Sequence, residues 1–312
     1  MIISILEKID FTVDQLARLK KLGKVQTFNY LDGDYIDHEK IHEVAINSNV
    51  IVVNWIDPTP FLMEMKSDSL VALLSTGYGW ITNIAEAKAK GISVAYIPGC
   101  STEAVAEHLL GLLLGVTKHI FDQLNVEKQN GKVGCEIAGK TVGIIGLGKI
   151  GTRFAEILQF FGAKVITYNR TNKQRNGITD VTLKFLLHTS DIICMTPALN
   201  NESKNLINST NYHLVKDDAI IIGSTLYAIS FDTIVSLIAE KSVTVAFDAA
   251  LEGELDRNTV TRETIRELLL KRERLFFTPH VAYFTNESEF RRLNTCVSNI
   301  EAFIFGNPQN IV

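Results

Sequence analysis

Short apolar runs alternate with stretches of helical periodicity along most of the chain. Runs rich in β-branched residues predict strands, and they cover residues 2–6, 50–55, 70–75, 93–97, 141–146, 165–168, 191–195, 219–223, 243–247 and 275–278. Strands that are apolar throughout and lie between amphipathic helices are typical of parallel sheets covered on both faces. The pattern therefore predicts an α/β protein.

Several helices carry their own start and stop signals. Thr12 is placed to cap a helix, Gln15 completes a capping box with it, and Gly23 ends the helix. The apolar stripe of this helix consists of Val13, Leu16 and Leu19. Ser230 caps a later helix whose buried face consists of Ile234, Leu237 and Ile238. The final helix places Phe290, Leu293, Val297 and Ile300 at helical spacing.

A candidate domain boundary lies near residue 100. The Pro98-Gly99 turn leads into "STEAVAEHLLGLLLG", a helix with a broad apolar face suited to packing between two domains. Residues 1 to about 100 then form one α/β unit, and residues 101 to 282 form another. The final helix follows both units.

Composition and charge restrict the class of protein and of partner. The chain of 312 residues is 46 % hydrophobic and 21 % charged, which suffices for two packed domains. A net charge of −4 gives no electrostatic reason to bind nucleic acid or an anionic membrane, so a small-molecule partner is expected. No targeting or membrane-spanning segment is visible.

The cysteines point to a reducing compartment. Cys100, Cys135, Cys194 and Cys296 are widely spaced and form no CxxC pair. This spacing predicts neither a disulfide framework nor a metal site, and we expect a cytoplasmic protein. Motifs of metallopeptidases, serine hydrolases and P-loop nucleotidases are also missing from the sequence.

A glycine-rich turn carries the strongest chemical signal. Gly146, Gly148 and Gly151 have GxGxxG spacing directly after an apolar strand and at the opening of a helix. That helix has an apolar face consisting of Phe154, Ile157, Leu158 and Phe161. In a complete βαβ unit these glycines permit a tight turn, the approach of a pyrophosphate and close helix–strand packing. The alternative, glycines that serve only the turn, is much less common in this context.

The end of the second strand of this unit lacks the usual acid. A dinucleotide-binding fold normally has an acidic residue here that accepts from the ribose hydroxyls, but the stretch "VITYNRT" has Asn169, Arg170 and Thr171. Asn169 removes the repulsion of a 2′-phosphate, and Arg170 with Thr171 supplies donors to it. We therefore expect NADP(H) in preference to NAD(H). The alternative is that Arg170 is only a solvated surface base.

Further motifs make the chain resemble a known family. They are "STGYGWITNIAEAKAKGISVAYIPG", "AVAEHLLGLLLG", "DIICMTPALNNESKNLIN", "AFDAALEGE" and "FFTPHVAYFTNES". Together with the glycine turn, and in this order, they make nearly the whole chain resemble the D-isomer-specific 2-hydroxyacid dehydrogenases.

The resemblance implies a fold, an assembly and a reaction. It implies a Rossmann cofactor domain, residues 101–282, inserted into a flavodoxin-like substrate domain made of residues 1–100 plus 283–312. It also implies a homodimer formed through the cofactor domain and an active site in the cleft between the domains. The reaction would be hydride transfer between a nicotinamide cofactor and C2 of a 2-keto or 2-hydroxy acid.

The resemblance assigns the acid/base pair to two residues. His280 matches the histidine of the family's TPH tripeptide, and an imidazole suits the proton transfer that accompanies carbonyl reduction. The family's glutamate, which hydrogen-bonds the histidine, falls on Gly253 when counted from Asp248. One inserted residue brings Glu254 into register, and we assign this role to Glu254 over Glu252. The alternative is that both are solvated loop carboxylates.

The resemblance also assigns the cofactor contacts beyond the glycine turn. Asp248 matches a position that contacts the nicotinamide carboxamide. The remaining cofactor residues implied by the match are Lys149, Ile150, Thr196, Pro197 and Thr225.

One expected residue is missing from the substrate site. The family has an arginine that holds the substrate's carboxylate and carbonyl, but alignment of residues 191–222 places Leu226 there, followed by Tyr227. Leucine neither donates a hydrogen bond nor carries charge, and losing one donor to a developing oxyanion typically costs about 3 kcal/mol. Either the substrate is unusual, or another group substitutes, or the chemistry has been lost.

Other groups are left to bind the substrate. The backbone N–H groups of Gly77, Tyr78 and Gly79 match the family's carboxylate-binding loop, and Leu226 with Tyr227 would line the pocket. Aromatic side chains in segments that the resemblance places near the cleft favour a bulkier substrate, although aromatics are more often core: Trp55, Tyr78, Trp80, Tyr227, Tyr283 and Phe284.

Two functions are consistent with the sequence. The first is an NADP-dependent oxidoreductase of the 2-hydroxyacid dehydrogenase type with His280 as acid/base and an atypical pocket. The second is a nucleotide-binding regulatory protein without turnover. The intact His280 segment favours the enzyme, and the missing arginine favours the regulator.

Overall fold

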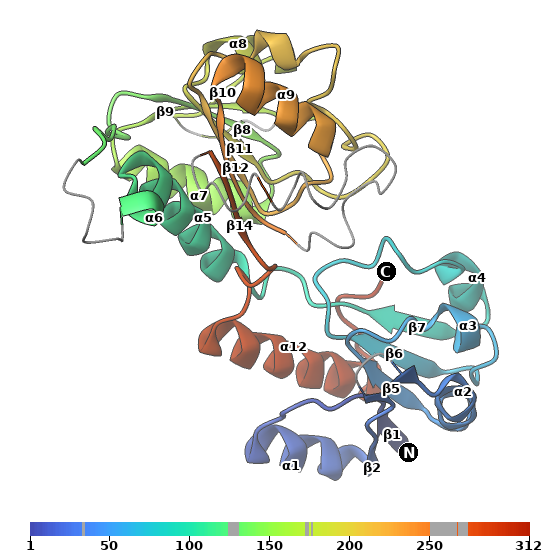
Figure 1. Cartoon of the computed structure of the whole chain (residues 1–312). Coiled ribbons are helices and arrows are strands. Elements are labelled where there is room, and N and C mark those ends of the chain that lie inside the picture. Colours follow the sequence, from blue (N-terminus) through green and yellow to red (C-terminus); the bar gives the residue numbers. More distant parts are fainter. Residues whose placement is uncertain (33–34, 124–130, 172–174, 176, 250–266, 268–273) are drawn as a thin grey trace. The chain divides into compact units, whose positions relative to one another are not determined.

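The chain folds into two compact units, shown in the computed structural model in Figure 1. The structure describes residues 1–32, 35–123, 131–171, 175, 177–249, 267 and 274–312. Unit 1 consists of Met1–Cys100 and Asn286–Val312, and unit 2 consists of Ser101–Thr285. The sequence analysis placed the point where the chain returns from unit 2 to unit 1 between residues 282 and 283. In the structure unit 2 ends at Thr285.

Unit 1 is built on a five-stranded sheet in which every neighbouring pair is parallel. In spatial order the strands are β2 (Lys24–Thr27), β1 (Ile2–Ile5), β5 (Val50–Val53), β6 (Ser69–Leu73) and β7 (Ile92–Ala95). A separate antiparallel pair consists of β3 (Leu31–Asp32) and β4 (Tyr35–Ile36). Without that pair, the order is the flavodoxin-like 2-1-3-4-5 arrangement.

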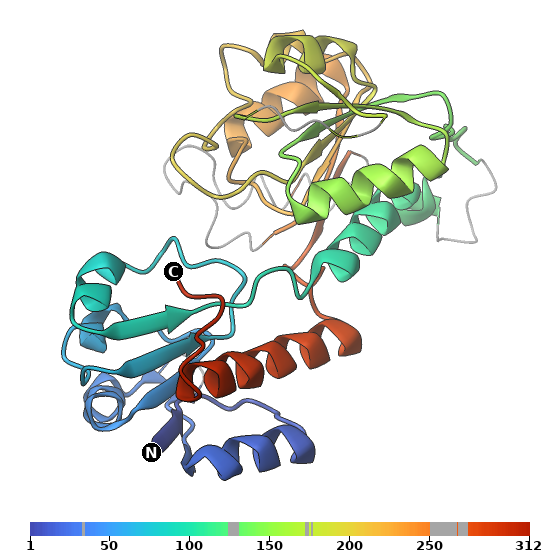
Figure 2. The ribbon, with the colours of Figure 1, turned by 180° about the vertical axis from the view of Figure 1, so that it is seen from behind.

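Helices cover both faces of this sheet (Figure 2). On one face lie α1 (Val13–Leu22) and α12 (Asn286–Ile304), whose apolar residues share a core with Ile3, Val52 and Leu70. The other face packs against α2 (His38–Asn47), α3 (Thr59–Leu62) and α4 (Ile84–Ala89). The sheet is therefore buried on both sides, as its apolar strands require.

The C-terminal segment completes unit 1. On α12, Glu301 accepts two hydrogen bonds from Arg18 of α1, at 2.9 Å from Nε and 2.6 Å from Nη2. Beyond α12, Ile311 forms an antiparallel bridge with Ala95 of β7. The N-terminal sheet and the last residues of the chain thus form one folded unit.

Unit 2 is built on a seven-stranded sheet, also with parallel neighbours throughout. In spatial order the strands are β10 (Thr179–Asp180), β9 (Lys164–Tyr168), β8 (Thr141–Ile145), β11 (Ile192–Met195), β12 (Ile220–Gly223), β13 (Thr244–Asp248) and β14 (Leu275–Thr278). This is the Rossmann order 3-2-1-4-5-6 with one strand added.

The helices of unit 2 also form two layers. The helices α5 (Thr102–Thr117) and α7 (Lys149–Phe160) pack on one face, and α8 (Leu183–Thr189) and α9 (Phe231–Lys241) pack on the other. Two short helices, α6 (Ile120–Gln123) and η1 (Tyr212–Leu214), lie in the connections. The predicted fold class, a Rossmann unit inserted into a flavodoxin-like unit, is confirmed.

Some local predictions were wrong. Strand β2 was not predicted, because it lies at a sheet edge and carries polar residues. Strands β3, β4 and β10 were not predicted, because each has only two residues. Val13, Phe161 and Phe290 were predicted on apolar faces but are 84, 38 and 57 % exposed. Val13 is the first residue of α1 and Phe161 is the C-cap of α7, so both lie at helix ends, whereas the exposure of Phe290 within α12 has no structural explanation.

Candidate active site

The glycine turn between β8 and α7 is shaped by close contacts. Gly146 has a positive φ of +95°, and a Cβ there would lie 2.6 Å from Pro197 Cα. A Cβ on Gly151 would lie 2.3 Å from Gly146 O, so the helix approaches the turn this closely only with glycine. A Cβ on Gly148 would meet nothing within 4 Å. The space beside Gly148 is therefore open.

Helix α7 begins at this open space. Gly148 is its N-cap and supplies no side-chain hydrogen bond, and Lys149 and Ile150 are its first residues. The first N–H groups of a helix lack partners within the helix and carry a partial positive charge. The turn thus offers backbone donors to an anion.

Residues after the neighbouring strands pack against the turn. Thr196, directly after β11, donates from Oγ1 to Gly146 O at 2.9 Å, and Pro197 follows it. Thr225, which follows β12, is buried, and its Oγ1 accepts from Tyr227 N at 3.1 Å. The predicted cofactor residues therefore gather at the carboxyl edge of one sheet, where open α/β sheets bind ligands.

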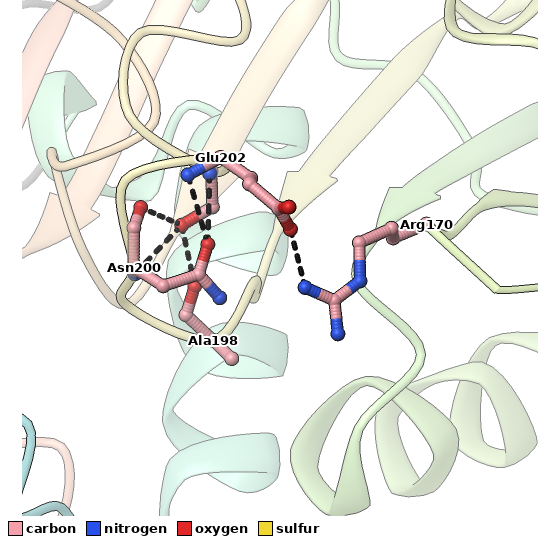
Figure 3. Close-up of polar contacts among 5 residues, drawn as sticks. Arg170, Ala198, Asn200 and Glu202 are labelled. Carbon is pink, nitrogen blue, oxygen red and sulfur yellow. Dashed lines mark hydrogen bonds and ion pairs between the residues drawn. The ribbon is translucent and has the colours of Figure 1, made fainter.

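The segment after β9 reaches the same edge. Asn169 Oδ1 accepts from Leu147 N at 2.6 Å, so this side chain fixes the glycine turn to the end of β9. The exposed Arg170 forms an ion pair with Glu202, and Figure 3 shows its guanidinium directed at that carboxylate. The hydrogen bond that Arg170 donates to Glu202, together with the negative charge of Glu202, raises the pKa of Arg170. Thr171 is exposed beside it.

Asp248 fixes the loop that follows β14. This carboxylate at the end of β13 is 1 % exposed. Its Oδ1 accepts from Thr278 Oγ1 at 2.6 Å and from Val281 N at 2.9 Å, and its Oδ2 accepts from Ala282 N at 2.8 Å. In this structure Asp248 therefore positions the His280 loop, and its contact with a nicotinamide stays a prediction.

A histidine on α5 extends this hydrogen-bond chain. His108 Nε2 lies 2.8 Å from Thr278 Oγ1 and 3.8 Å from Asp248 Oδ1. Because the Thr278 hydroxyl donates to Asp248, His108 Nε2 is the donor to the Thr278 oxygen. The chain from His108 through Thr278 to Asp248 links helix α5 to the loop.

His280 lies in the loop held by Asp248. Its backbone is left-handed, with φ +54°, and its N–H donates to Thr278 O at 2.9 Å. The side chain is exposed, and its ring meets Tyr283 edge-on at a centroid distance of 5.7 Å. An exposed imidazole on a fixed backbone is suited to repeated proton transfer.

Leu226 does not lie at the surface of unit 2. Its side chain is 3 % exposed and belongs to the apolar cluster that contains Ile207, Phe231 and Phe247. Tyr227 is half-buried beside it, and its carbonyl accepts from Asn205 N at 3.0 Å. The position that the resemblance gives to a clamping arginine is thus apolar interior, and a pocket role for Leu226 stays a prediction.

Glu7 holds the loop after β5 in unit 1. This carboxylate follows β1 and is 4 % exposed. Its Oε1 accepts from Asn54 N, Trp55 N and Ile56 N at 2.7, 2.9 and 2.9 Å. Strands β1 and β5 flank the point where the strand order reverses, which is the usual ligand-binding edge of such a sheet. Glu7 thereby presents Trp55 at that edge.

The loop after β6 lies next to this one. Gly77 N donates to Ser75 Oγ at 3.2 Å, a length that leaves the donor open to a stronger acceptor such as a carboxylate. The Tyr78 ring packs edge-on against Tyr96 at 5.0 Å. A Cβ on Gly77 or Gly79 would have nothing within 4 Å, so this backbone is open.

Unit 1 has a cavity beside Trp55. Its volume is about 600 Å³, and Ile56, Phe61, His38 and His42 also line it. Four of the predicted pocket aromatics do not lie in the core, because their exposed fractions are 63 % for Trp55, 38 % for Tyr78, 44 % for Trp80 and 65 % for Phe284.

The predicted base partner of His280 cannot be placed. Glu254 and its alternative Glu252 both lie outside the described residues.

Comparison of the sequence with known proteins shows the family of this chain. Residues 110–282 match the family model of the D-isomer specific 2-hydroxyacid dehydrogenase, NAD binding domain. The chain belongs to the D-isomer-specific 2-hydroxyacid dehydrogenase family. It is 30 % identical over 258 residues to a hydroxypyruvate reductase of Blautia hydrogenotrophica, covering 78 % of this chain and 77 % of the relative. It is 29 % identical over 290 residues to a glycerate dehydrogenase of Methylorubrum extorquens, covering 88 % of each.

A solved structure agrees at the level of the fold. An acyclic imino acid reductase in complex with NADPH and D-Arg superimposes with a TM-score of 0.86 at 23 % identity, over 100 % of both chains. As a member of the dehydrogenase family, this protein is an NAD(P)-dependent oxidoreductase that acts on CH–OH groups.

The residues present fit the dinucleotide of this dehydrogenase family. The open space at Gly148 admits a pyrophosphate next to the start of α7, and Gly151 with Thr196 keeps the turn tight. The first N–H groups of α7 would hold the phosphates, and the residues after β9 would meet the adenosine ribose.

Some positioning residues of this dehydrogenase were missed in the sequence. They are Glu7, His108, Glu202 and Thr278. Glu7 carried a signal, because an acidic residue directly after a buried strand needs a partner. His108 and Thr278 carried none, since they are separated by 170 positions in the sequence.

Two further findings concern metals and membranes. In the described part of the chain, no group of three or more His, Cys, Asp or Glu side chains is placed to hold a metal ion. Among the helices that the structure describes, none combines the length and the apolar character that a membrane span requires.

Proposed function

We propose that this protein transfers a hydride between NADP(H) and C2 of a 2-keto or 2-hydroxy acid, or of a related carbonyl compound. The observation that supports this best is the loop of residues 278–282, which Asp248 holds while the His280 side chain stays exposed. The two relatives are named for hydroxypyruvate and glycerate, a 2-keto acid and a 2-hydroxy acid. The same substrate class is proposed here.

His280 is the proposed acid and base. In reduction its protonated imidazole gives a proton to the carbonyl oxygen, and in oxidation the neutral ring takes the hydroxyl proton. Bound NADP(H) supplies or accepts the hydride. Asp248 keeps the loop of His280 fixed in both directions of the reaction. Glu254 is proposed to hydrogen-bond the His280 ring.

The cofactor is proposed to be NADP(H), with NAD(H) as the weaker alternative. Asn169 carries no charge that would repel a 2′-phosphate, and the exposed Arg170 and Thr171 offer it donors. NADPH should bind more tightly than NADH in fluorescence titrations, and Arg170→Ala should remove the difference. Equal affinity of the wild type for both cofactors would contradict the proposal.

The substrate is proposed to be larger than glyoxylate or pyruvate. With apolar interior at Leu226, a small acid lacks the bidentate clamp that would orient it, so its carboxylate depends on the backbone of residues 77–79. The cavity beside Trp55 gives room for a larger side chain. Leu226→Arg would bury an unpaired charge and destabilise the fold, so Trp55→Ala is the better variant for testing the pocket.

A substrate series tests the function. The decrease in NADPH absorbance is followed with glyoxylate, pyruvate and phenylpyruvate, with NADH as a control. Phenylpyruvate should be reduced best by the wild type, and Trp55→Ala should lower kcat/KM for it alone. Glyoxylate reduction with kcat/KM of roughly 10⁴ M⁻¹s⁻¹ or more would refute the atypical pocket.

A histidine pair tests the acid/base assignment. His280→Gln should lower kcat by about 100-fold or more and leave the NADPH dissociation constant unchanged. His213→Gln, an exposed histidine of η1, is the matched control and should retain activity. A folded wild type that binds NADPH but turns over no compound of the series would favour the regulatory alternative.

Assembly and compartment are proposed from the family resemblance and the composition. We expect a cytoplasmic homodimer formed through unit 2. Ile120, Val133 and Phe160 of this unit are 46, 94 and 90 % exposed, and a subunit interface would cover such side chains. Light scattering coupled to size-exclusion chromatography measures the mass, and a monomer at micromolar concentration would contradict the dimer.

A further inference from the structure

The ion pair of Arg170 and Glu202 crosses the predicted adenosine site. Arg170 follows β9, and Glu202 lies in the loop that follows β11. In the sheet, β8 lies between these two strands. The pair, which Figure 3 shows, therefore joins segments that follow strands on opposite sides of β8, the strand that leads into the glycine turn.

The backbone around Glu202 is held by its neighbours. Asn200 Oδ1 accepts from Glu202 N and from Ser203 N, both at 3.1 Å. Ser203 Oγ donates to Ala198 O at 2.5 Å and to Asn200 O at 2.9 Å. The Glu202 side chain takes no part in this network, and 64 % of it is exposed. The carboxylate is thus presented to Arg170 from a fixed loop.

We infer that Glu202 competes with the cofactor's 2′-phosphate for Arg170 and so sets how strongly the protein prefers NADP(H). The inference rests on the proposed cofactor site. In the free protein the Glu202 carboxylate already neutralises the guanidinium that the phosphate would use. A bound 2′-phosphate must displace that carboxylate and then lies near its negative charge. NADH has a hydroxyl at this position and avoids both costs.

The size of the effect follows from exposure. Both side chains are largely in water, 72 % exposed for Arg170 and 64 % for Glu202. Exposed ion pairs are weak and are screened by salt, so Glu202 tunes the preference without blocking NADP(H). Removing its charge should strengthen binding of the 2′-phosphate by about three- to tenfold.

Binding of adenosine fragments tests the inference without turnover. The probes are 2′,5′-ADP, which carries the 2′-phosphate, and 5′-AMP, which lacks it, both titrated by calorimetry into the whole protein. Glu202→Gln keeps the size of the side chain and the backbone network but removes the charge. Glu240→Gln removes an equal charge from α9, where Glu240 bonds a neutral tyrosine, and serves as the control.

The expected results separate this inference from the cofactor proposal. Glu202→Gln should lower the dissociation constant of 2′,5′-ADP by about three- to tenfold and change that of 5′-AMP by less than about twofold. Glu240→Gln should change neither. In the Arg170→Ala background, Glu202→Gln should lose most of its effect, because no guanidinium is left to compete for.

Three outcomes would overturn the inference. If Glu202→Gln leaves 2′,5′-ADP binding unchanged while Arg170→Ala weakens it, the cofactor proposal stands and the competition does not exist. Weaker 2′,5′-ADP binding in Glu202→Gln would show that Glu202 positions Arg170. If Arg170→Ala leaves the ratio of 2′,5′-ADP to 5′-AMP affinity unchanged, the cofactor proposal itself fails, and the inference fails with it.

Discussion

Asp248 shows how much one buried carboxylate can determine in a loop. Its oxygens accept from Thr278, Val281 and Ala282, which leaves the side chain of His280 exposed between bonded neighbours. An asparagine at this position has the same shape but no charge. Its NH₂ group would replace one of the two carboxylate oxygens, so a hydrogen-bond donor would face a backbone N–H. The residue therefore affects both folding and the position of the proposed acid/base.

Asp248→Asn should lower the free energy of unfolding by about 2 kcal/mol and should lower kcat more than cofactor affinity. Urea denaturation and steady-state kinetics measure the two effects. Thr278→Ser keeps the hydroxyl that donates to Asp248 and is the control, with stability close to the wild type. An Asp248→Asn variant with wild-type stability would show that water or another group replaces these bonds.

Single residues also mark the limit of sequence reasoning at the site. The glycine motif and the TPH tripeptide were readable because each chemical requirement is met within a few consecutive positions. The bond between His108 and Thr278 joins residues 170 positions apart, and Arg170 and Glu202 are separated by 32. The burial of Leu226 in the apolar cluster could not be predicted from the sequence either, because it depends on tertiary packing, and a pocket role for this residue stays a prediction.

At the scale of elements, the glycines of the turn have different roles: Gly151 is needed for packing, whereas Gly148 leaves space for a ligand. A Cβ on Gly151 would lie 2.3 Å from Gly146 O, whereas one on Gly148 would meet nothing within 4 Å. Gly148 also has an ordinary φ of −78°, so alanine is not strained there. The free space beside it is useful only when a ligand comes close.

Gly148→Ala should therefore melt within about 1 °C of the wild type and bind NADPH at least about tenfold more weakly. Gly151→Ala should lower the melting temperature by several degrees, because the start of α7 must move away from β8. Thermal melts and fluorescence titrations compare the pair. Unchanged NADPH affinity in Gly148→Ala would place the pyrophosphate elsewhere.

One ion pair in the contact between α1 and α12 joins Arg18 to Glu301. The hydrogen bond from Arg18 lowers the pKa of Glu301 below its ordinary value, against the smaller opposing effect of burial. A lowered folded pKa stabilises the protein above the unfolded value of about 4.3, and this stabilisation is lost as pH falls through the folded pKa. The two helices should therefore hold together best at neutral pH.

Glu301→Gln should lower the free energy of unfolding by about 1 kcal/mol at pH 7, since the pair is bidentate but partly exposed. The difference from the wild type should shrink as the pH falls below the ordinary carboxyl range. Urea denaturation across pH measures it, with the exposed Glu287→Gln of the same helix as control. A difference that is constant with pH would rule out the ion pair as its source.

Elements differ in how well the sequence predicts them. The central strands were predicted because burial on both faces makes each one a continuous apolar run. Thr12 and Gln15 form the predicted capping box, with bonds of 2.9 and 3.2 Å. Strand β2, "KVQT", was missed because an edge strand tolerates polar side chains and leaves only a weak pattern.

At the scale of the whole molecule, unit 1 is closed by contacts between its two chain segments. Cys100 O, at the end of the first segment, accepts from Arg291 Nε of α12 at 2.8 Å. The two points where the chain passes into and out of unit 2 are therefore close together in space. A short linker should be able to replace unit 2.

A chain in which a short Gly/Ser linker replaces residues 101–285 should fold and melt cooperatively, with far-UV circular dichroism typical of an α/β protein. The matched control ends at residue 100 and lacks α12. It should not melt cooperatively, because Leu293, Val297 and Ile300 no longer cover the sheet. A linked unit 1 without a cooperative transition would mean that it needs unit 2 for its stability.

Because the chain returns to unit 1 only at α12, unit 1 can complete its folding in the cell only after α12 has been synthesised. During translation the N-terminal strands leave the ribosome first, and the whole of unit 2 is made before α12 appears. Until then Leu70, Ala72 and Leu74 lack the helix that covers them, and such surfaces attract chaperones. Protease digestion of stalled nascent chains should find unit 2 protected before residues 1–100. The first part of the protein to be made is the last to fold.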